Sequence, residues 1–178
     1  MLSRYLGAFA LITFSSACDQ WPNTTETKVT WWQCSSGPVM VTNIEHISLI
    51  YGTYEYPIRL AEPLLIATTI NDQSSTYNSP GLKQTIKVWQ WNVNTCRWAS
   101  VPTFGLLNNL DACTNGVPCP IRPGNNQVIN LELDFSDVPA IINLLNNDKP
   151  YQLEYLLHDD VSKEDLCIIF QARALTHS

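Results

Sequence analysis

The cysteines are the residues of this chain with the clearest capacity for chemistry, and two of them lie close together. Cys113 and Cys119 flank five residues that include an Asn-Gly turn signal and Pro118, so the backbone between them must fold back sharply. A short disulfide can close such a loop, and Pro120 then ends any hydrogen-bonded element that starts at the bridge. The spacing therefore indicates a structural cross-link.

The N-terminal residues indicate the cellular compartment in which these thiols react. Residues 1–17 combine Arg4, the apolar run Leu6–Phe14 and the small residues Ser15–Ala17, which is the pattern of a cleaved secretory signal peptide. The run is shorter than the roughly 20 residues of a spanning helix, so a signal anchor is the minor alternative. The secretory lumen is oxidising, and thiols pair there. Sequence alone does not choose among the pairings of the remaining six cysteines: Cys18, Cys34, Cys96, Cys113, Cys119 and Cys167.

Residues that could catalyse a reaction do not form a recognisable set. His46, His158 and His177 are scattered without metal-ligand spacing, and the sequence contains neither a Gly-x-Ser-x-Gly elbow nor a phosphate-binding loop. His158 precedes Asp159 and Asp160, which would suit a base with an orienting carboxylate, but an acidic turn beside a histidine is more often solvated surface. We therefore expect no enzyme activity, no metal and no cofactor.

The charge balance narrows the range of partners. The chain has 10 basic and 16 acidic residues, a net charge of −6, and it lacks the basic surface that nucleic-acid binding requires. Anionic membranes would repel it at neutral pH. We expect a polar lead over residues 18–27, with the only glycosylation sequon at Asn23, followed by one domain over residues 28–176.

Apolar and polar residues alternate along most of this domain, which indicates strands that each bury one face. The segment Pro139–Asn146 is the one helix-like piece, because its proline suits a first helical turn. Strands separated by turn clusters at this spacing predict an all-β antiparallel sandwich. The predicted strands are Val29–Gln33, Pro38–Ile50 with a bulge at Asn43 or Glu45, Pro63–Ile70, Leu82–Val93, Val128–Phe135, Tyr151–Leu157 and Leu166–Ala174.

The chain resembles the ML lipid-recognition domain family, which includes the Niemann–Pick type C sterol carrier and the ganglioside activator. The likeness runs from about Trp31 to Leu175, and its most specific piece is Cys113–Ile121, which looks like the family's Cys-x5-Cys-Pro-Ile segment. The segment Tyr51–Pro57 departs from the sterol carrier because it lacks a second short cysteine loop, and Cys96 has no counterpart there.

The resemblance implies an immunoglobulin-like sandwich, stabilised by disulfides, whose two sheets separate to hold a lipid. It implies the bridges Cys34–Cys167 and Cys113–Cys119, and Cys18–Cys96 is then the remaining pair. From the alternation alone, the inward apolar residues would fill a closed core. By the resemblance they line a lipid cavity: Ile129, Leu131, Leu133, Phe135, Leu153, Tyr155, Ile168 and Phe170.

Two apolar segments flanked by turn residues are candidates for the rim of this cavity. Exposed at its mouth, they would contact a membrane during lipid pickup; folded inward, they would plug the core. The rim candidates are Phe104, Leu106, Leu107, Ile141, Ile142 and Leu144.

The expected function is that of a secreted or lysosomal lipid-binding and lipid-transfer protein for a sterol or another single lipid, without a catalytic residue. Its partners would be the lipid, a membrane in transient contact, and a membrane receptor or hydrolase. One alternative is an activator that presents a sphingolipid or phospholipid to a hydrolase. Another is an extracellular recognition module with a closed core.

Overall fold

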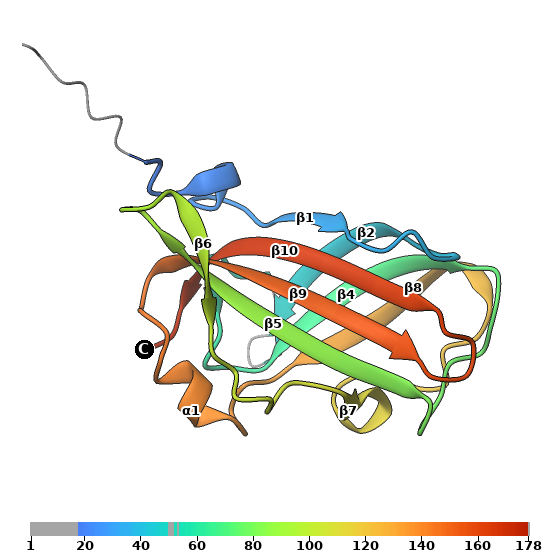
Figure 1. Ribbon diagram of the computed structural model, residues 1–178. Helices are drawn as coiled ribbons and strands as arrows, with labels where there is room; N and C mark the ends of the chain where they lie inside the picture. The colour runs from blue at the N-terminus through green and yellow to red at the C-terminus, as the bar shows by residue number, and fades with distance from the viewer. Residues whose placement is uncertain (1–17, 50–51, 53, 178) are drawn as a thin grey trace, which may run out of the picture.

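The chain folds into two facing β-sheets with short helical turns at their edges (Figure 1). The computed structural model describes residues 18–49, 52 and 54–177, so the predicted signal peptide lies outside the described residues. The larger sheet has the order β1 (Thr30–Gln33), β10 (Asp165–Leu175), β9 (Lys149–Asp159), β5 (Leu82–Asn92) and β6 (Arg97–Val101), with β3 (Ile58–Arg59) beside β10 and β7 (Leu110–Asp111) beside β5. The smaller sheet has the order β2 (Val39–Ser48), β4 (Leu64–Asp72) and β8 (Gly124–Leu133).

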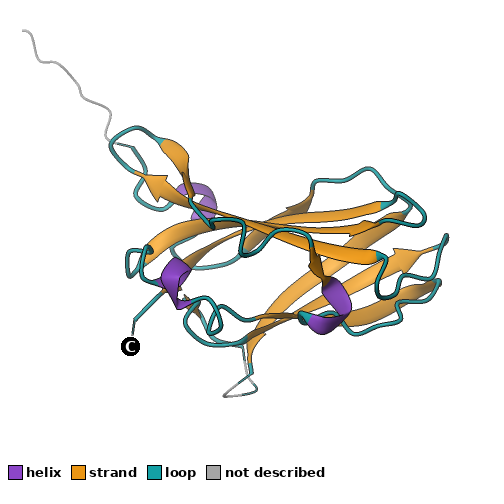
Figure 2. Cartoon of the chain, turned by 60° about the horizontal axis from the view of Figure 1, so that its bottom comes forward, coloured by secondary structure: helices purple, strands orange, loops and turns teal. Residues whose placement is uncertain are grey.

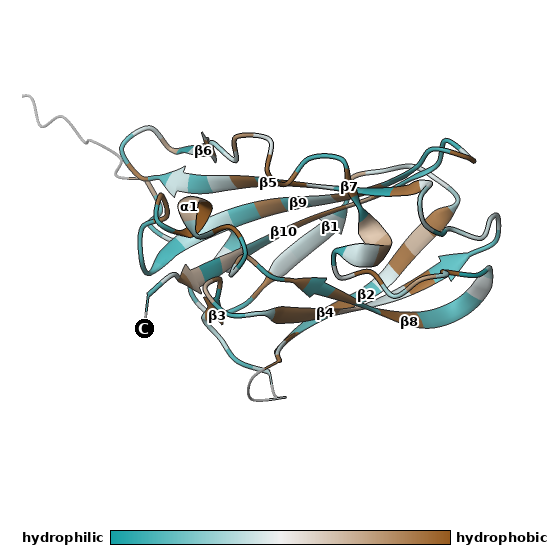
Figure 3. Ribbon diagram, turned by 90° about the horizontal axis from the view of Figure 1, so that it is seen from below, coloured by the Kyte–Doolittle hydropathy of each residue, from teal (hydrophilic) through white to brown (hydrophobic). Residues whose placement is uncertain are grey.

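The prediction of an antiparallel sandwich is confirmed. Every strand pair is antiparallel except β3 with β10, which runs parallel. The alternation of the sequence becomes alternating burial, most regularly in β4, where every second residue from Leu64 to Asp72 is buried. Figure 3 shows the two sheets one above the other. Buried apolar residues from both sheets form one hydrophobic core.

Two local predictions are also tested by the backbone. The register between β2 and β4 shifts between Val41 and Asn43, so the bulge lies at Thr42, one residue before the first of its two predicted positions. The helix is shorter than predicted: α1 spans Pro139–Ile142 and continues only as hydrogen-bonded turns. No side chain caps its N-terminus, so little stabilises a longer helix.

Three disulfides join segments that are distant in the sequence or sharply folded. Two of them are the pairs that the resemblance implies, and the third joins the two cysteines that remained. Cys34–Cys167 ties β1 to β10 within the larger sheet, and Cys113–Cys119 closes the short loop after β7. The third bridge, Cys18–Cys96, attaches the N-terminal lead to the turn between β5 and β6. The lead is held there further because the indole nitrogen of Trp91 donates to the carbonyl of Asp19 over 2.7 Å.

Candidate functional site

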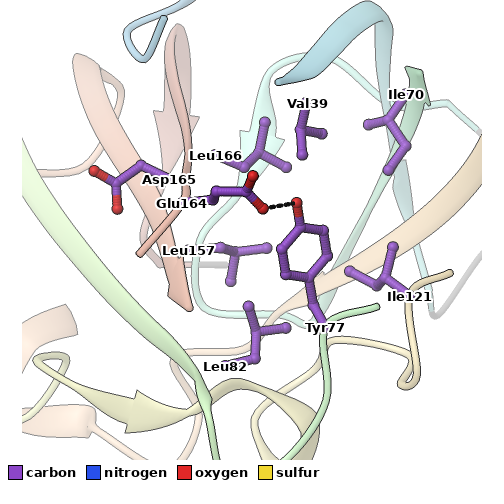
Figure 4. A pocket seen from close by; sticks show the side chains of 9 residues that line it. All are labelled: Val39, Ile70, Tyr77, Leu82, Ile121, Leu157, Glu164, Asp165 and Leu166. Carbon is purple, nitrogen blue, oxygen red and sulfur yellow. Dashed lines mark hydrogen bonds between the residues drawn. The ribbon is translucent and has the colours of Figure 1, made fainter. Parts of the chain in front are cut away.

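The space between the sheets is almost completely filled by side chains. One residual space of about 20 Å³ lies among Val39, Ile70, Tyr77, Leu157 and Leu166 at one end of the sandwich (Figure 4). A second, also of about 20 Å³, lies among Ile44, His46, Ile58, Leu64, Ile66 and Phe170. Each has room for about one water molecule.

The first of these spaces is bounded by polar groups on one side. The hydroxyl of Tyr77 donates to Glu164 Oε2 over 2.8 Å and shares a hydrogen bond of 2.9 Å with the hydroxyl of Ser74. Burial raises the pKa of Tyr77, and its hydrogen bond lowers the pKa of Glu164. These contacts join the loop after β4 to the turn before β10 and hold this end of the sandwich closed.

The eight residues predicted to line a lipid cavity all lie in this closed core. Each is buried, none with more than 7% of its surface exposed: Ile129, Leu131, Leu133, Phe135, Leu153, Tyr155, Ile168 and Phe170. Pockets for drug-sized ligands have volumes of about 300–1,000 Å³. A lipid could therefore enter among these residues only if the two sheets moved apart.

The two sheets are bridged at one edge by the segment 102–121, which we call the edge segment. β6 covers β5 from Val88 onward and β7 covers Lys83 and Gln84. Between them, the nitrogen of Ile86 donates to the carbonyl of Leu107 over 2.9 Å. Further along the edge segment, the carbonyl of Gly116 accepts from the nitrogen of Glu132 in β8 over 2.8 Å. Figures 2 and 3 show this crossing, with α1 and the helical turn after β7 between the sheet edges.

A groove of about 320 Å³ opens where the edge segment passes between β5 and β8, and we call it the edge groove. Two inward-facing residues of β5, Gln84 and Ile86, reach its wall. Apolar side chains of the edge segment and the carboxylates of β8 and the loop after it form most of the remaining lining: Leu106, Leu107, Leu110, Glu132, Asp134 and Asp137. Thr114, Asn115, Gly116 and Val138 complete it. The groove therefore connects the surface with inward-facing residues of β5.

The predicted rim residues divide into two groups. Phe104 is 71% exposed, and Leu106 and Leu144 are each 46% exposed. For the other three the expected exposure at the rim is wrong. Leu107, Ile141 and Ile142 are buried in the core. Their side chains plug the interior because the backbone of Leu107 is fixed to β5 and the turn of α1 directs both isoleucines inward.

A second groove, of about 450 Å³, lies on the outer side of the same edge. It is lined mainly by polar and apolar residues of the β5–β6 hairpin, together with Gln20, Pro102, Leu144, Lys149 and Pro150. Leu144 therefore lies beside the start of the edge segment, and Val138 lies beside Leu106 and Leu107 in the edge groove. Phe104 and Leu106 are thus exposed on the edge segment, and Leu144 is exposed in the groove that the start of this segment also lines.

One functional candidate was not anticipated from the sequence. Gln84 occupies an inward position of β5 between the buried residues Leu82 and Ile86, and its side chain is 3% exposed. Its Oε1 accepts a hydrogen bond of 2.8 Å from the hydroxyl of Tyr155, which is itself 1% exposed. The signal that would have found it is a polar residue on the otherwise apolar face of an alternating strand.

The remaining candidates lie apart from one another. The side chain of His46 is buried, with Nε2 2.9 Å from the carbonyl oxygen of Glu55, and desolvation lowers its pKa. Nδ1 of His158 lies 2.7 Å from a carboxylate oxygen of Asp165 at the surface. Within the described part of the chain, no group of three or more histidines, cysteines and carboxylates could hold a metal ion.

The lead carries the predicted glycosylation site. Asn23 Nδ2 donates to Gln171 Oε1 over 2.7 Å. A glycan on this nitrogen would leave it one hydrogen, so the contact and the predicted modification are compatible. The described residues include no helix with the length and apolar character needed to cross a membrane.

The fold defines the class of protein as a disulfide-stabilised antiparallel β-sandwich. No protein-family model matches the chain, and no curated protein matches it. Among solved structures, the chain is similar to a Niemann-Pick type C2 protein from Japanese carpenter ant, with a TM-score of 0.47 and 10% sequence identity over 82% of this chain and 98% of that one. The class stated here rests on the two sheets and three bridges of the chain itself.

Proposed function

We propose that this protein binds a single lipid between its two sheets and transfers it between membranes. The observation that carries the proposal is the margin between β5 and β8. Inward-facing residues of the core, Gln84 and Ile86, reach the edge groove there, and exposed Phe104 and Leu106 lie on the segment that covers it. Neighbouring exposed apolar side chains on one short segment support contact with a membrane or a partner.

The binding step would use the apolar core itself as the ligand site. Displacing the edge segment would uncover the inner faces of both sheets, including Leu131, Leu133 and Leu153. Burying a chain of about ten methylenes contributes about 8 kcal/mol at about 0.8 kcal/mol for each group. Association costs offset part of this gain, but no charged anchor is needed.

The transfer step would begin at the exposed residues. Phe104, Leu106 and Leu144 would insert their side chains among lipid headgroups and hold the groove against the bilayer. A sterol is the ligand that we favour, and the protein would act in the extracellular space or the lysosomal lumen. Three disulfides fit an oxidising compartment of this kind.

The second candidate function is that of a recognition module with a closed core. The observation that favours it is the small space between the sheets, about 20 Å³ at each of the two positions. Such a protein would bind its partner on the surface and would take up no lipid.

Extraction with organic solvent followed by mass spectrometry separates the two candidates. The purified full chain is extracted directly, and a second sample is extracted after incubation with phosphatidylcholine vesicles that contain a sterol. The lipid-transfer proposal expects about one lipid molecule per protein in at least one sample. A protein that remains empty in both, and whose melting temperature no lipid raises, would overturn it in favour of the closed module.

A further inference from the structure

We propose that Gln84, oriented by Tyr155, recognises an uncharged hydroxyl on the headgroup of the lipid. This inference rests on the proposed function and adds the chemical class of the ligand. Gln84 has an unusual position for a polar residue. A primary amide lies on the inner face of the sandwich, 3% exposed, in a row with the apolar residues Leu82, Ile86 and Val88.

The orientation of this amide follows from its buried neighbour. Gln84 is the hydrogen-bond partner of the Tyr155 hydroxyl, and the hydroxyl is buried within the core. A buried hydroxyl whose proton finds no acceptor is costly, so the amide must present its oxygen to Tyr155. The two hydrogens of Nε2 then point away from the Tyr155 hydroxyl. The hydrogen bonds found among the described residues include none donated by Nε2.

Gln84 forms part of the wall of the edge groove, so a partner for these hydrogens would have to be a ligand atom in the groove. A ligand atom seated there must accept a hydrogen bond. The groove is large enough, at about 320 Å³, for a small headgroup at the entrance to the core. The buried amide thus supplies one fixed donor at the boundary between core and surface.

The charges around the groove select among possible acceptors. Three carboxylates line it, those of Glu132, Asp134 and Asp137, and none of the described residues in its wall is basic. A fatty-acid carboxylate or a phosphate monoester would be repelled. A hydroxyl suits both features, since its oxygen accepts from Nε2 and its proton donates to a carboxylate. The site therefore fits a lipid alcohol.

A pair of variants isolates the amide from its supporting contact. Tyr155→Phe removes the hydroxyl but keeps the donor of Gln84. The double variant Gln84→Met with Tyr155→Phe removes the donor as well and leaves no buried hydroxyl without a partner, so it stays compatible with folding. The two variants differ only in the amide.

The measurement is competitive uptake from one vesicle preparation. Phosphatidylcholine vesicles containing equal amounts of hexadecanol, hexadecane and palmitic acid are incubated with each protein, and the lipids bound to the repurified protein are quantified by mass spectrometry. We expect the native chain to favour hexadecanol over palmitic acid, and Tyr155→Phe to keep this preference in weaker form because its amide has lost the partner that orients it. The ratio of hexadecanol to hexadecane should fall about fivefold in the double variant.

The outcomes distinguish this inference from the proposed function. If the native chain takes up the three lipids without favouring the alcohol, or if both variants show the same ratio of alcohol to hydrocarbon, headgroup recognition by Gln84 is overturned while lipid binding stands. If the native chain takes up none of them and also none of the sterol offered above, the proposed function itself falls, and this inference falls with it.

Discussion

The backbone nitrogen of Glu132 donates to the carbonyl of Gly116 over 2.8 Å, and this one bond attaches the Cys113–Cys119 loop to the edge of β8. Gly116 has a φ of 95°, and a Cβ atom at this position would clash with the carbonyl oxygen of Glu132. The contact therefore requires glycine for two reasons, its backbone conformation and its lack of a side chain. It fixes one end of the bridge between the sheets.

Replacing this glycine should destabilise the protein more than backbone strain alone would. We expect Gly116→Ala to lower the melting temperature by about 10 °C, because it adds a steric clash to the roughly 1–3 kcal/mol cost of a left-handed residue. Gly105→Ala is the matched control, since Gly105 also has a positive φ, 78°, but has open space around it. Equal shifts in the two variants, measured by calorimetry, would contradict the steric argument.

The exposed residues of the margin should govern association with membranes. We expect Phe104→Ser to weaken binding to phosphatidylcholine vesicles about tenfold, because a buried phenylalanine contributes about 1.5–3 kcal/mol. The melting temperature should stay unchanged, since Phe104 is exposed. Val161→Ser, in the turn between β9 and β10 and 83% exposed, is the control and should bind vesicles as the native chain does. Equal losses in both variants would show that the margin has no special role.

The buried side chain of Leu107 should act as a plug over the core. Leu107→Ala and Leu60→Ala both truncate a buried leucine, so each should cost about 2–5 kcal/mol of unfolding free energy in urea. Only Leu107→Ala should also speed the uptake of a fluorescent sterol from vesicles, because Leu60 lies outside the edge groove. If uptake accelerates in both variants, general loosening rather than opening of the edge explains it.

Burial of His46 should make the protein less stable in mild acid. Desolvation disfavours its charged form, so its pKa in the folded chain lies below the unfolded value of about 6.5. The unfolded state therefore binds more protons as the pH falls below about 6.5, and the stability that His46 contributes above that pH is lost on the way down. His46→Gln keeps a donor for the carbonyl of Glu55 without titrating. Urea unfolding at about pH 7 and about pH 5 should show a smaller decrease for the variant, and an equal decrease would refute the assignment.

The long disulfide and the short disulfide should have separable effects. Loop closure predicts a loss of about 5 kcal/mol when Cys34 and Cys167 are both replaced by serine, and about 2.4 kcal/mol for Cys113 and Cys119. The short bridge lies in the edge segment, so its removal should also change the rate of sterol uptake, whereas removal of the long bridge should not. Urea unfolding and vesicle uptake measure the two effects, and uptake unaffected by loss of the short bridge would argue against opening at this edge.

The long strands were predictable because their pattern is repeated. Tyr151–Leu157 alternates over most of a strand, and β9 extends two residues beyond this segment at each end. The strands β3 and β7 have two residues each, too few to show any period, and they form only because a neighbouring strand offers free hydrogen-bonding groups.

The site was less predictable because its parts depend on contacts between distant segments. An apolar residue in a loop, such as Leu106 or Leu107, carries no local signal that says which of the two faces the core. Leu107 turns inward because its backbone is held by Ile86, which lies more than twenty residues earlier in the chain. The partnership of Gln84 with Tyr155 likewise exists only once β5 and β9 are paired.

The bridging of β5 and β8 by the edge segment has a consequence for solubility. In the closed chain the hydrogen-bonding groups along these margins are partly capped, by β6, β7 and the bonds of Leu107 and Gly116. Lifting the segment would free them, and bare strand edges are templates for pairing with other chains. The open form would thus be the aggregation-prone form. If the core takes up a lipid as proposed, closing the segment over it would also protect the protein from self-association.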